Sequence, residues 1–145
     1  DVEVIAGATA AQSGSAVLGA PLAHDFAVVS LSDLLTPWEV IERRLDAVAS
    51  ADFCICLYNP RSRKRADRLS RAAKIMLEWK APDTLCGWVR NIGREGQRSG
   101  MCRLSELGEI DADMFTTVFV GNADTKLVGG RMVTPRGYRE IPCER

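Results

Sequence analysis

Basic side chains crowd one short stretch of the sequence, and they are Arg61, Arg63, Lys64 and Arg65. They follow Asn59-Pro60, which ends an apolar run over residues 52–58 that predicts a buried strand. Open α/β sheets bind ligands just beyond the carboxyl ends of their strands, and arginine forks suit carboxylates and phosphates. We therefore expect Arg61 and Arg63 to contact an anionic ligand. A solvated helix surface is the alternative.

The other reactive side chains form no recognised catalytic motif. The sequence contains no G-x-S-x-G, no P-loop and no G-x-G-x-x-G. Its single histidine, His24, stands in a predicted turn, where a structural role competes with one as a general acid or base. The five cysteines are an odd number, which favours reduced thiols in a cytoplasmic protein over a disulfide framework. A zinc site would need more ligands than the single histidine and these cysteines offer at suitable spacing. We expect no metal.

The composition is that of a globular protein. The chain has 145 residues, 46% of them hydrophobic, and this length suits one to one and a half domains. No apolar run is long enough for a membrane helix. Residues 1–4 include neither an initiator Met nor the basic start of a signal peptide, so we expect them to continue a longer protein.

A formal net charge of zero hides a separation along the sequence. Residues 61–103 contain twelve Lys or Arg and only four Asp or Glu, a net charge of +8, and the rest of the chain carries −8. The basic cluster has no interleaved aromatic platform, and Trp79 and Trp88 of the window are expected in the core, so the pattern disfavours a nucleic-acid partner, whereas a small anion suits it.

Alternating patterns predict an α/β fold, with a mainly parallel or mixed sheet flanked by helices and a C-terminal β-hairpin. A helix start is predicted at Thr36-Pro37, with Glu39 completing a capping box. Small residues predict a closely packed helix up to residue 20. We expect residues 1–24 to end a preceding domain and residues 25–145 to form a compact one. The strands are predicted at 2–5, 26–31, 52–58, 85–89, 101–104 and 115–120, the later helices at 37–49 and 64–80, and the hairpin at 126–133.

Longer motifs occur in a fixed order along almost the whole chain. They are Gly7-Ala8-Thr9-Ala10-Ala11, Leu18-Gly19-Ala20-Pro21-Leu22, His24-Asp25-Phe26, the segment 30–38, Leu57-Tyr58-Asn59-Pro60-Arg61-Ser62, the segment 89–95, the segment 116–122 and the segment 132–138. Together they resemble the C-terminal part of the precorrin-3B C17-methyltransferases, members of the tetrapyrrole methylase family that act in cobalamin synthesis. Ala6 stands where that family commonly has proline.

The resemblance implies two α/β domains with S-adenosylmethionine (SAM) between them, usually in a homodimer. It also implies methylation of C17 of a tetrapyrrole with contraction of the ring. The glycine-rich entry loop and the Gly-Asp-Pro-type loop of the family's N-terminal domain do not occur in this sequence, so the resemblance implies a fragment that is inactive alone. By position, the cofactor would be lined by Thr9, Ala10, Ala11, Tyr58, Asn59, Arg90, Asn91, Thr116 and Thr117.

Within the same resemblance, Arg61 and Arg63 would bind substrate carboxylates, and His24 would serve proton transfer. A methyl transfer to a substrate carbon needs alignment and desolvation more than a protein nucleophile, which agrees with the missing catalytic motif. Two alternatives stay open. One is another tetrapyrrole methylase step, and the other is a non-catalytic domain that binds an anionic ligand or nucleic acid. A location away from membranes, in the cytoplasm, is expected.

Overall fold

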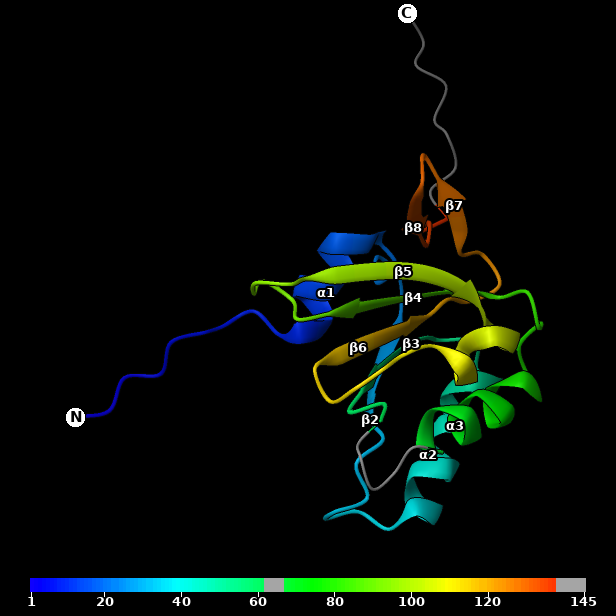
Figure 1. Ribbon diagram of the computed structural model, residues 1–145, viewed down its shortest axis with the longest axis horizontal. Coiled ribbons are helices and arrows are strands. Elements are labelled where there is room, and N and C mark those ends of the chain that lie inside the picture. The colour runs from blue at the N-terminus through cyan, green and yellow to red at the C-terminus, as the bar shows by residue number, and fades with distance from the viewer. Residues whose placement is uncertain (62–66, 138–145) are drawn as a thin grey trace, which may run out of the picture.

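The computed structural model describes residues 1–61 and 67–137. It contains two sheets, one of five strands in the order β2-β3-β6-β4-β5 and one of three in the order β1-β8-β7 (Figure 1). The strands are β1 (Gly19–Ala20), β2 (Phe26–Ser30), β3 (Cys54–Tyr58), β4 (Leu85–Arg90), β5 (Arg98–Arg103), β6 (Thr116–Val120), β7 (Lys126–Val128) and β8 (Arg131–Val133). The helices are α1 (Ala10–Leu18), α2 (Trp38–Ser50), α3 (Arg68–Leu77) and the 3-10 helix η1 (Leu104–Glu109).

The five-stranded sheet is mixed, as predicted. Strands β2 and β3 are parallel, whereas β6 is antiparallel to β3 and β4, and β5 is antiparallel to β4. The carboxyl ends of β2, β3 and β4 therefore meet the amino end of β6 at one edge of the sheet. We call this the pocket edge.

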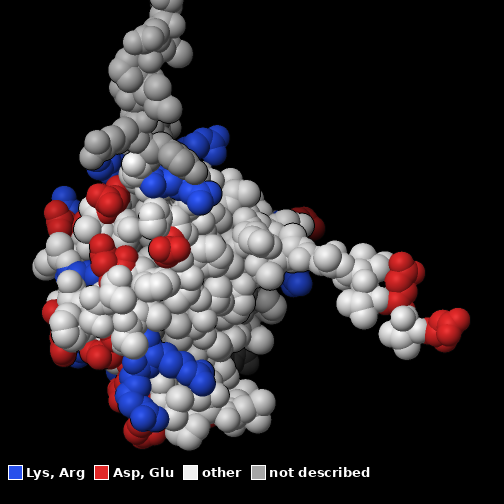
Figure 2. Space-filling model, turned by 180° about the vertical axis from the view of Figure 1, so that it is seen from behind, with Lys and Arg blue, Asp and Glu red and all other residues white. Residues whose placement is uncertain are grey.

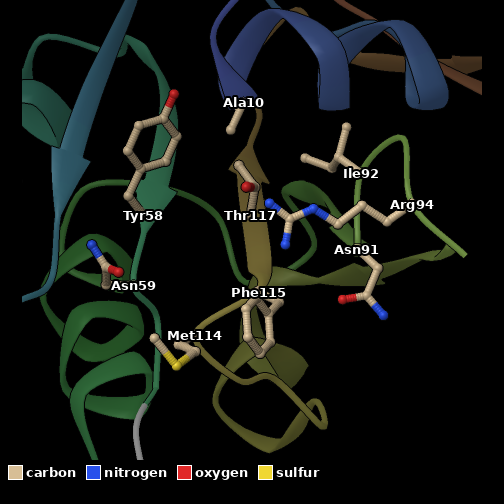
Figure 3. Close-up of a pocket in the computed structure, with 9 residues that line it drawn as sticks. All are labelled: Ala10, Tyr58, Asn59, Asn91, Ile92, Arg94, Met114, Phe115 and Thr117. Carbon is tan, nitrogen blue, oxygen red and sulfur yellow. The ribbon is translucent and has the colours of Figure 1, made fainter. Parts of the chain in front are cut away.

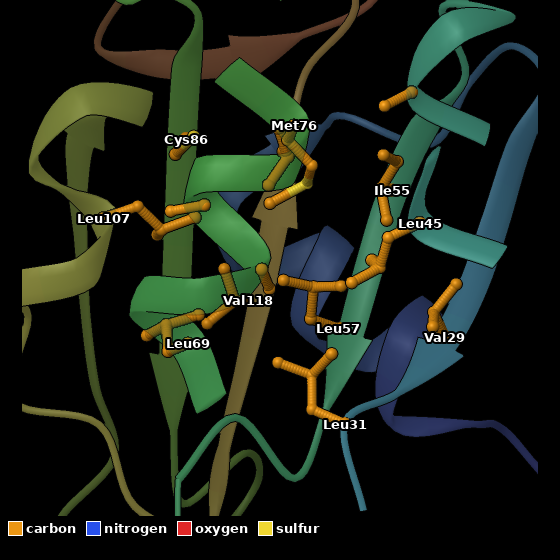
Figure 4. Close-up of a cluster of buried hydrophobic side chains, with 14 of the residues drawn as sticks. Val29, Leu31, Leu45, Ile55, Leu57, Leu69, Met76, Cys86, Leu107 and Val118 are labelled. Carbon is orange, nitrogen blue, oxygen red and sulfur yellow. The ribbon is translucent and has the colours of Figure 1, made fainter. Parts of the chain in front are cut away.

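One face of this sheet, here the helical face, packs against α2, α3 and η1. Ile55 and Leu57 of β3 and Val118 of β6 point into this core, and they are completely buried (Figure 4). They meet Leu45 of α2 and Met76 of α3, which are also completely buried. The apolar stripes of the two helices explain this packing, because residues three and four apart share one face of a helix.

The opposite face, here the α1 face, carries a smaller cluster. Cys56 of β3, Phe119 of β6 and Val89 of β4 pack there with Leu18 of α1. Helix α1 approaches closely, since a Cβ added at Gly14 would lie 2.8 Å from Phe119 Cζ. The small residues of this helix thus allow close contact with the sheet, as the sequence predicts.

The C-terminal hairpin is present, with one connection that the sequence did not reveal. Strands β7 and β8 pair around Gly129 and Gly130, whose φ angles of 55° and 75° suit glycine. Strand β8 also pairs in parallel with β1. The buried hydroxyl of Thr134 reinforces this junction, because it donates to the Pro21 carbonyl at 2.8 Å and lies 2.8 Å from the Thr125 hydroxyl.

Three local predictions were wrong. Residues 2–5 form no strand, and Val2, Val4 and Ile5 are exposed, because no strand of the described chain pairs with them. The capping box at Thr36 does not form, since α2 starts one residue later and Pro37, which has no side-chain donor or acceptor, occupies the N-cap position. Helix α3 ends at Leu77 rather than residue 80. The division into domains at residue 24 stays a prediction.

The cysteines are free thiols in the described part of the chain, and Cys143 lies outside it. Burial raises the pKa of Cys56 from 9.0 to about 12, which keeps this thiol protonated near neutral pH. Among residues 1–61 and 67–137, no group of three or more His, Cys, Asp or Glu side chains could hold a metal ion. No helix in these ranges has both the length and the apolar character needed to cross a bilayer.

Candidate functional site

A pocket of about 270 Å³ opens at the pocket edge, beside the start of α1 (Figure 3). Side chains from α1, from the ends of β3 and β4 and from the start of β6 reach it. The lining residues are Ala10, Tyr58, Asn59, Asn91, Ile92, Arg94, Met114, Phe115 and Thr117. Pockets that bury a whole small molecule usually measure about 300–1,000 Å³, so this one suits part of a ligand.

The first turn of α1 is fixed firmly against the sheet. Thr9 caps the helix, since its hydroxyl accepts a hydrogen bond from Gln12 N at 3.3 Å and Gln12 Oε1 accepts one from Thr9 N at 3.2 Å. The Ala11 amide donates to the hydroxyl of Tyr58 at 2.9 Å. The phenol of β3 therefore sets where the helix begins and how wide the pocket is.

Two asparagines end the strands beside the pocket in the left-handed conformation. Asn59 follows β3 with a φ of 52°, and Asn91 follows β4 with a φ of 53°. Asparagine tolerates this region better than most residues, because its short polar side chain can bond locally. Asn59 Nδ2 donates to Ser30 Oγ of β2 at 3.0 Å. Both turns direct the chain away from the sheet and leave room for a ligand.

The remaining wall is largely apolar. The Tyr58 ring and Ile92 form part of it, and Met114 and Phe115 form a lip that is 62% and 51% exposed. Thr117 places a hydroxyl on the floor, where the side chain itself is 5% exposed. A flat aromatic ring with polar substituents suits such a combination of apolar walls and amide side chains.

The predicted cofactor residues fall into two groups. Ala10, Tyr58, Asn59, Asn91 and Thr117 line the pocket together. The others do not line it and bond instead to neighbouring groups, and these are Thr9, Ala11, Arg90 and Thr116.

Arg90 and Thr116 share Asp113 as their partner. Arg90 Nη2 lies 2.6 Å from Asp113 Oδ2, and the Thr116 hydroxyl donates to Asp113 Oδ1 at 2.9 Å. The carboxylate thus joins the end of β4 to the start of β6. This arrangement fixes the loop that carries Met114 and Phe115, and it leaves the Arg90 guanidinium engaged.

Arg61 and His24 do not line this pocket. Arg61 Nη2 donates to the Gly108 carbonyl at 3.0 Å, and its buried Nε has no hydrogen-bond partner among the described residues. Arg63 lies outside the described residues. His24 precedes β2 at the opposite edge of the sheet from Tyr58, since β2 and β3 are parallel and Ser30 pairs with Tyr58. It accepts a hydrogen bond at Nδ1 from Asp25 N at 2.7 Å.

In the described part of the chain, four of the twelve basic residues of the window pair with acids from elsewhere in the sequence. Ion pairs join Arg68 to Asp33, Arg71 to Glu42, Lys80 to Asp52 and Arg90 to Asp113. Figure 2 shows both signs interspersed on the side of α2 and α3, with a largely uncharged area toward the N-terminal segment. On the face seen in Figure 2, the described residues of the window form no continuous positive surface, which weakens the nucleic-acid alternative.

Sequence reasoning missed four of the lining residues, namely Ile92, Arg94, Met114 and Phe115. Ile92 and Arg94 lie inside the motif 89–95, so the motif marked the segment without distinguishing its side chains. Met114 and Phe115 precede a strand and look like ordinary apolar residues. Their exposure, which identifies them as a lip, cannot be deduced from residue type.

Comparison with known proteins assigns the chain to a family of enzymes. Residues 1–108 match the family model described as tetrapyrrole (corrin/porphyrin) methylases. The chain therefore belongs to the tetrapyrrole methylase family.

Individual relatives make the similarity more specific. The chain is 46% identical over 138 residues to the probable cobalt-factor III C(17)-methyltransferase of Salmonella typhimurium, which covers 95% of this chain and 57% of that protein. It is 49% identical over 138 residues to the cobalamin biosynthesis protein CbiHC of Archaeoglobus fulgidus, covering 95% and 30%. The crystal structure of the methyltransferase CobJ matches with a TM-score of 0.83 and 40% identity, covering 89% of this chain and 54% of that one. The chain thus spans about half, or less, of the length of these proteins.

Proposed function

We propose that this chain is the C-terminal part of a SAM-dependent methyltransferase that methylates C17 of precorrin-3B or of its cobalt form, with ring contraction, in cobalamin synthesis. The observation that carries the proposal is the pocket where five of the residues expected to line the cofactor meet. The similarity to a probable cobalt-factor III C(17)-methyltransferase over 95% of the chain supports the same assignment. The homodimer and the cytoplasmic location belong to this proposal as well.

The pocket residues fit the adenosine part of SAM. Adenine would stack against the apolar wall of Tyr58, Ile92 and Phe115, and Asn59 and Asn91 would offer amide donors and acceptors to the base and the ribose. Because the pocket is smaller than a complete ligand site, the rest of the cofactor would contact the other part of the longer enzyme. We therefore propose residues 1–24 as the end of that other domain.

The residues of this chain would act by binding and orientation. When bound, SAM supplies an electrophilic methyl group, and the tetrapyrrole supplies the carbon that accepts it. The Tyr58–Ala11 hydrogen bond holds α1 at a fixed distance from the sheet, which keeps the pocket preformed. The Asp113 carboxylate holds the start of β6 through Thr116, and the exposed apolar side chains of Met114 and Phe115 would cover the bound cofactor and limit its contact with water. No side chain of this pocket needs to form a covalent intermediate.

The remaining predicted residues keep separate roles in the proposal. Binding of a substrate carboxylate by Arg61 stays a prediction, because its Nη2 is bonded to the Gly108 carbonyl and its Nε is buried, and Arg63 lies outside the described residues. Proton transfer by His24 stays a prediction, and its position at the far edge of the sheet favours a local role with Asp25.

The proposal is tested with two phenylalanines of similar exposure at opposite edges of the sheet. In the complete enzyme, Phe115→Ala removes part of the proposed adenine wall, and Phe26→Ala removes a side chain outside the pocket. We expect about tenfold weaker binding of S-adenosylhomocysteine by calorimetry for Phe115→Ala and no change for Phe26→Ala, because an aromatic contact and its buried area are lost only in the first.

Equal affinity of both variants and the unchanged enzyme would contradict the assigned cofactor pocket. Mass spectrometry of the products from precorrin-3B and cobalt-factor III tests the reaction itself. A product methylated at another ring position would assign the chain to a different tetrapyrrole methylase step.

A further inference from the structure

Arg94 is the one charged side chain among the residues that line the pocket. No acidic side chain lines it, and the ion pairs of the described residues do not include Arg94. Its neighbour Arg90 differs, because Asp113 and Asp111 lie 2.6 Å and 3.6 Å from the Arg90 guanidinium. The pocket thus has one cation that is free to pair with a ligand.

The backbone around Arg94 is held in a compact double turn. Arg94 N donates to the Asn91 carbonyl at 2.9 Å, and the Arg94 carbonyl accepts from Gln97 N at 3.2 Å. The Gln97 side chain accepts a further bond from Gly93 N at 2.7 Å. Figure 3 shows the Arg94 side chain extending from this turn into the pocket, toward Thr117. The loop therefore presents the guanidinium without needing a ligand to order its backbone.

The start of α1 lies beside the same pocket, but the amides of Ala11, Gln12 and Ser13 are already in use. Ala11 N bonds to the Tyr58 hydroxyl, and Gln12 N and Ser13 N bond to the side chain and the carbonyl of Thr9. The helix dipole still favours negative charge nearby, yet these amides are not free to bind an anion. Arg94 is the charged side chain of the pocket that can pair with an anion.

We infer that Arg94 binds a carboxylate of the ligand in this pocket, an inference that rests on the proposed function. Two carboxylates have the required chemistry, that of the amino-acid part of SAM and that of a tetrapyrrole side chain. A guanidinium suits either, because it donates two parallel hydrogen bonds to one carboxylate. In this assignment Arg90 is a positioning residue that holds Asp113, and Arg94 is the residue that contacts the ligand.

The test compares Arg94→Gln with Arg98→Gln in the complete enzyme. Both arginines are exposed, and Arg98 starts β5 outside the pocket, so neither substitution should change the melting temperature. Calorimetry with S-adenosylhomocysteine and with methylthioadenosine, which lacks the amino-acid carboxylate, measures the cofactor side. The KM for cobalt-factor III tests whether Arg94 contacts a carboxylate of the tetrapyrrole.

If Arg94 holds the cofactor carboxylate, Arg94→Gln weakens binding of S-adenosylhomocysteine about tenfold and leaves methylthioadenosine unchanged. If it holds the tetrapyrrole carboxylate, the KM for cobalt-factor III rises about tenfold and cofactor affinity stays unchanged. In either case Arg94→Lys loses less than Arg94→Gln, because it keeps the charge without the fork.

Cofactor affinities and a KM that stay within about twofold of the unchanged enzyme in Arg94→Gln would overturn the inference and leave the proposed function intact. If the complete enzyme without any substitution binds neither S-adenosylhomocysteine nor cobalt-factor III, both the inference and the proposed function are overturned. Equal losses in Arg94→Gln and Arg98→Gln would also overturn the inference, because they would reflect general surface charge.

Discussion

The two faces of the five-stranded sheet are built for different purposes. Two helices and η1 cover the helical face, and its core side chains are almost completely buried. The α1 face has one nine-residue helix, which packs on β4 and β6 and leaves Phe26 and Val28 of β2 about half exposed. The pocket opens on this second face, where α1 begins. The comparison indicates that stability comes mainly from one face and binding space from the other.

A single strand shows how one sequence serves both faces. Ile55 and Leu57 of β3 point to the helical face, and Cys56 and Tyr58 point to the α1 face. Successive side chains of a strand alternate between faces, so the apolar run over β3 divides into two large aliphatic residues and two residues with a thiol or a phenol. The phenol then becomes part of the pocket wall.

The largest effect is expected from Leu45→Ala on the helical face. Leu45 is completely buried, so its truncation leaves a cavity and should lower the free energy of unfolding by about 3 kcal/mol. Urea unfolding measures this loss, with Leu127→Ala, an exposed leucine of β7, as the matched control. A loss below about 1 kcal/mol would contradict the helical face as the main source of stability.

A smaller effect is expected from Gly14→Ala under α1. The added Cβ would lie 2.8 Å from Phe119 and 3.0 Å from Ile92, so the helix must move outward. We expect a loss of about 1–2 kcal/mol, because overcrowding outweighs the better helix propensity of alanine.

Since Ile92 also lines the pocket, Gly14→Ala should weaken binding of S-adenosylhomocysteine in the complete enzyme as well. Ser15→Ala, on the same helix, is the control. An increase in stability for Gly14→Ala would show that the α1 face is loosely packed rather than tightly fitted.

The smallest effect is expected from Tyr58→Phe. It removes the hydroxyl that accepts from Ala11 N, so the free energy of unfolding should fall by about 1 kcal/mol. Trp79→Phe is the control. It removes a solvent-exposed hydrogen bond to Asp46, so the free energy of unfolding should fall by less than in Tyr58→Phe. If Tyr58→Phe also leaves cofactor binding unchanged, then the position of α1 does not set the width of the pocket.

Much of the fold could be predicted because its local signals agree. The apolar run at β3, the stripes of α2 and α3 and the Gly129-Gly130 turn all gave the correct element. The strand at residues 2–5 failed, since a strand depends on a neighbour as well as on residue type. The pairing of β1 with β8 could not be foreseen, because it joins segments that are distant in the sequence.

The site was predictable in its segments and less so in its side chains. Motifs ending β3 and β4 and starting β6 pointed to the right edge of the sheet. The choice between Arg90 and Arg94 needed the structure, because only the position of Asp113 shows which guanidinium is already paired. The net charge of +8 over residues 61–103 overstated the positive charge of this region for the same reason. Most of the acidic side chains that form ion pairs with it lie outside this window in the sequence.

The hydrogen bond from Thr134 to the Pro21 carbonyl joins residues that are 113 positions apart. Closing so long a loop must await the rest of the chain, so it contributes late to folding. During synthesis, β1 leaves the ribosome before β8 and cannot pair with it until β8 has followed. A chain that stops before Arg131 would lack β8 and could not form the small sheet.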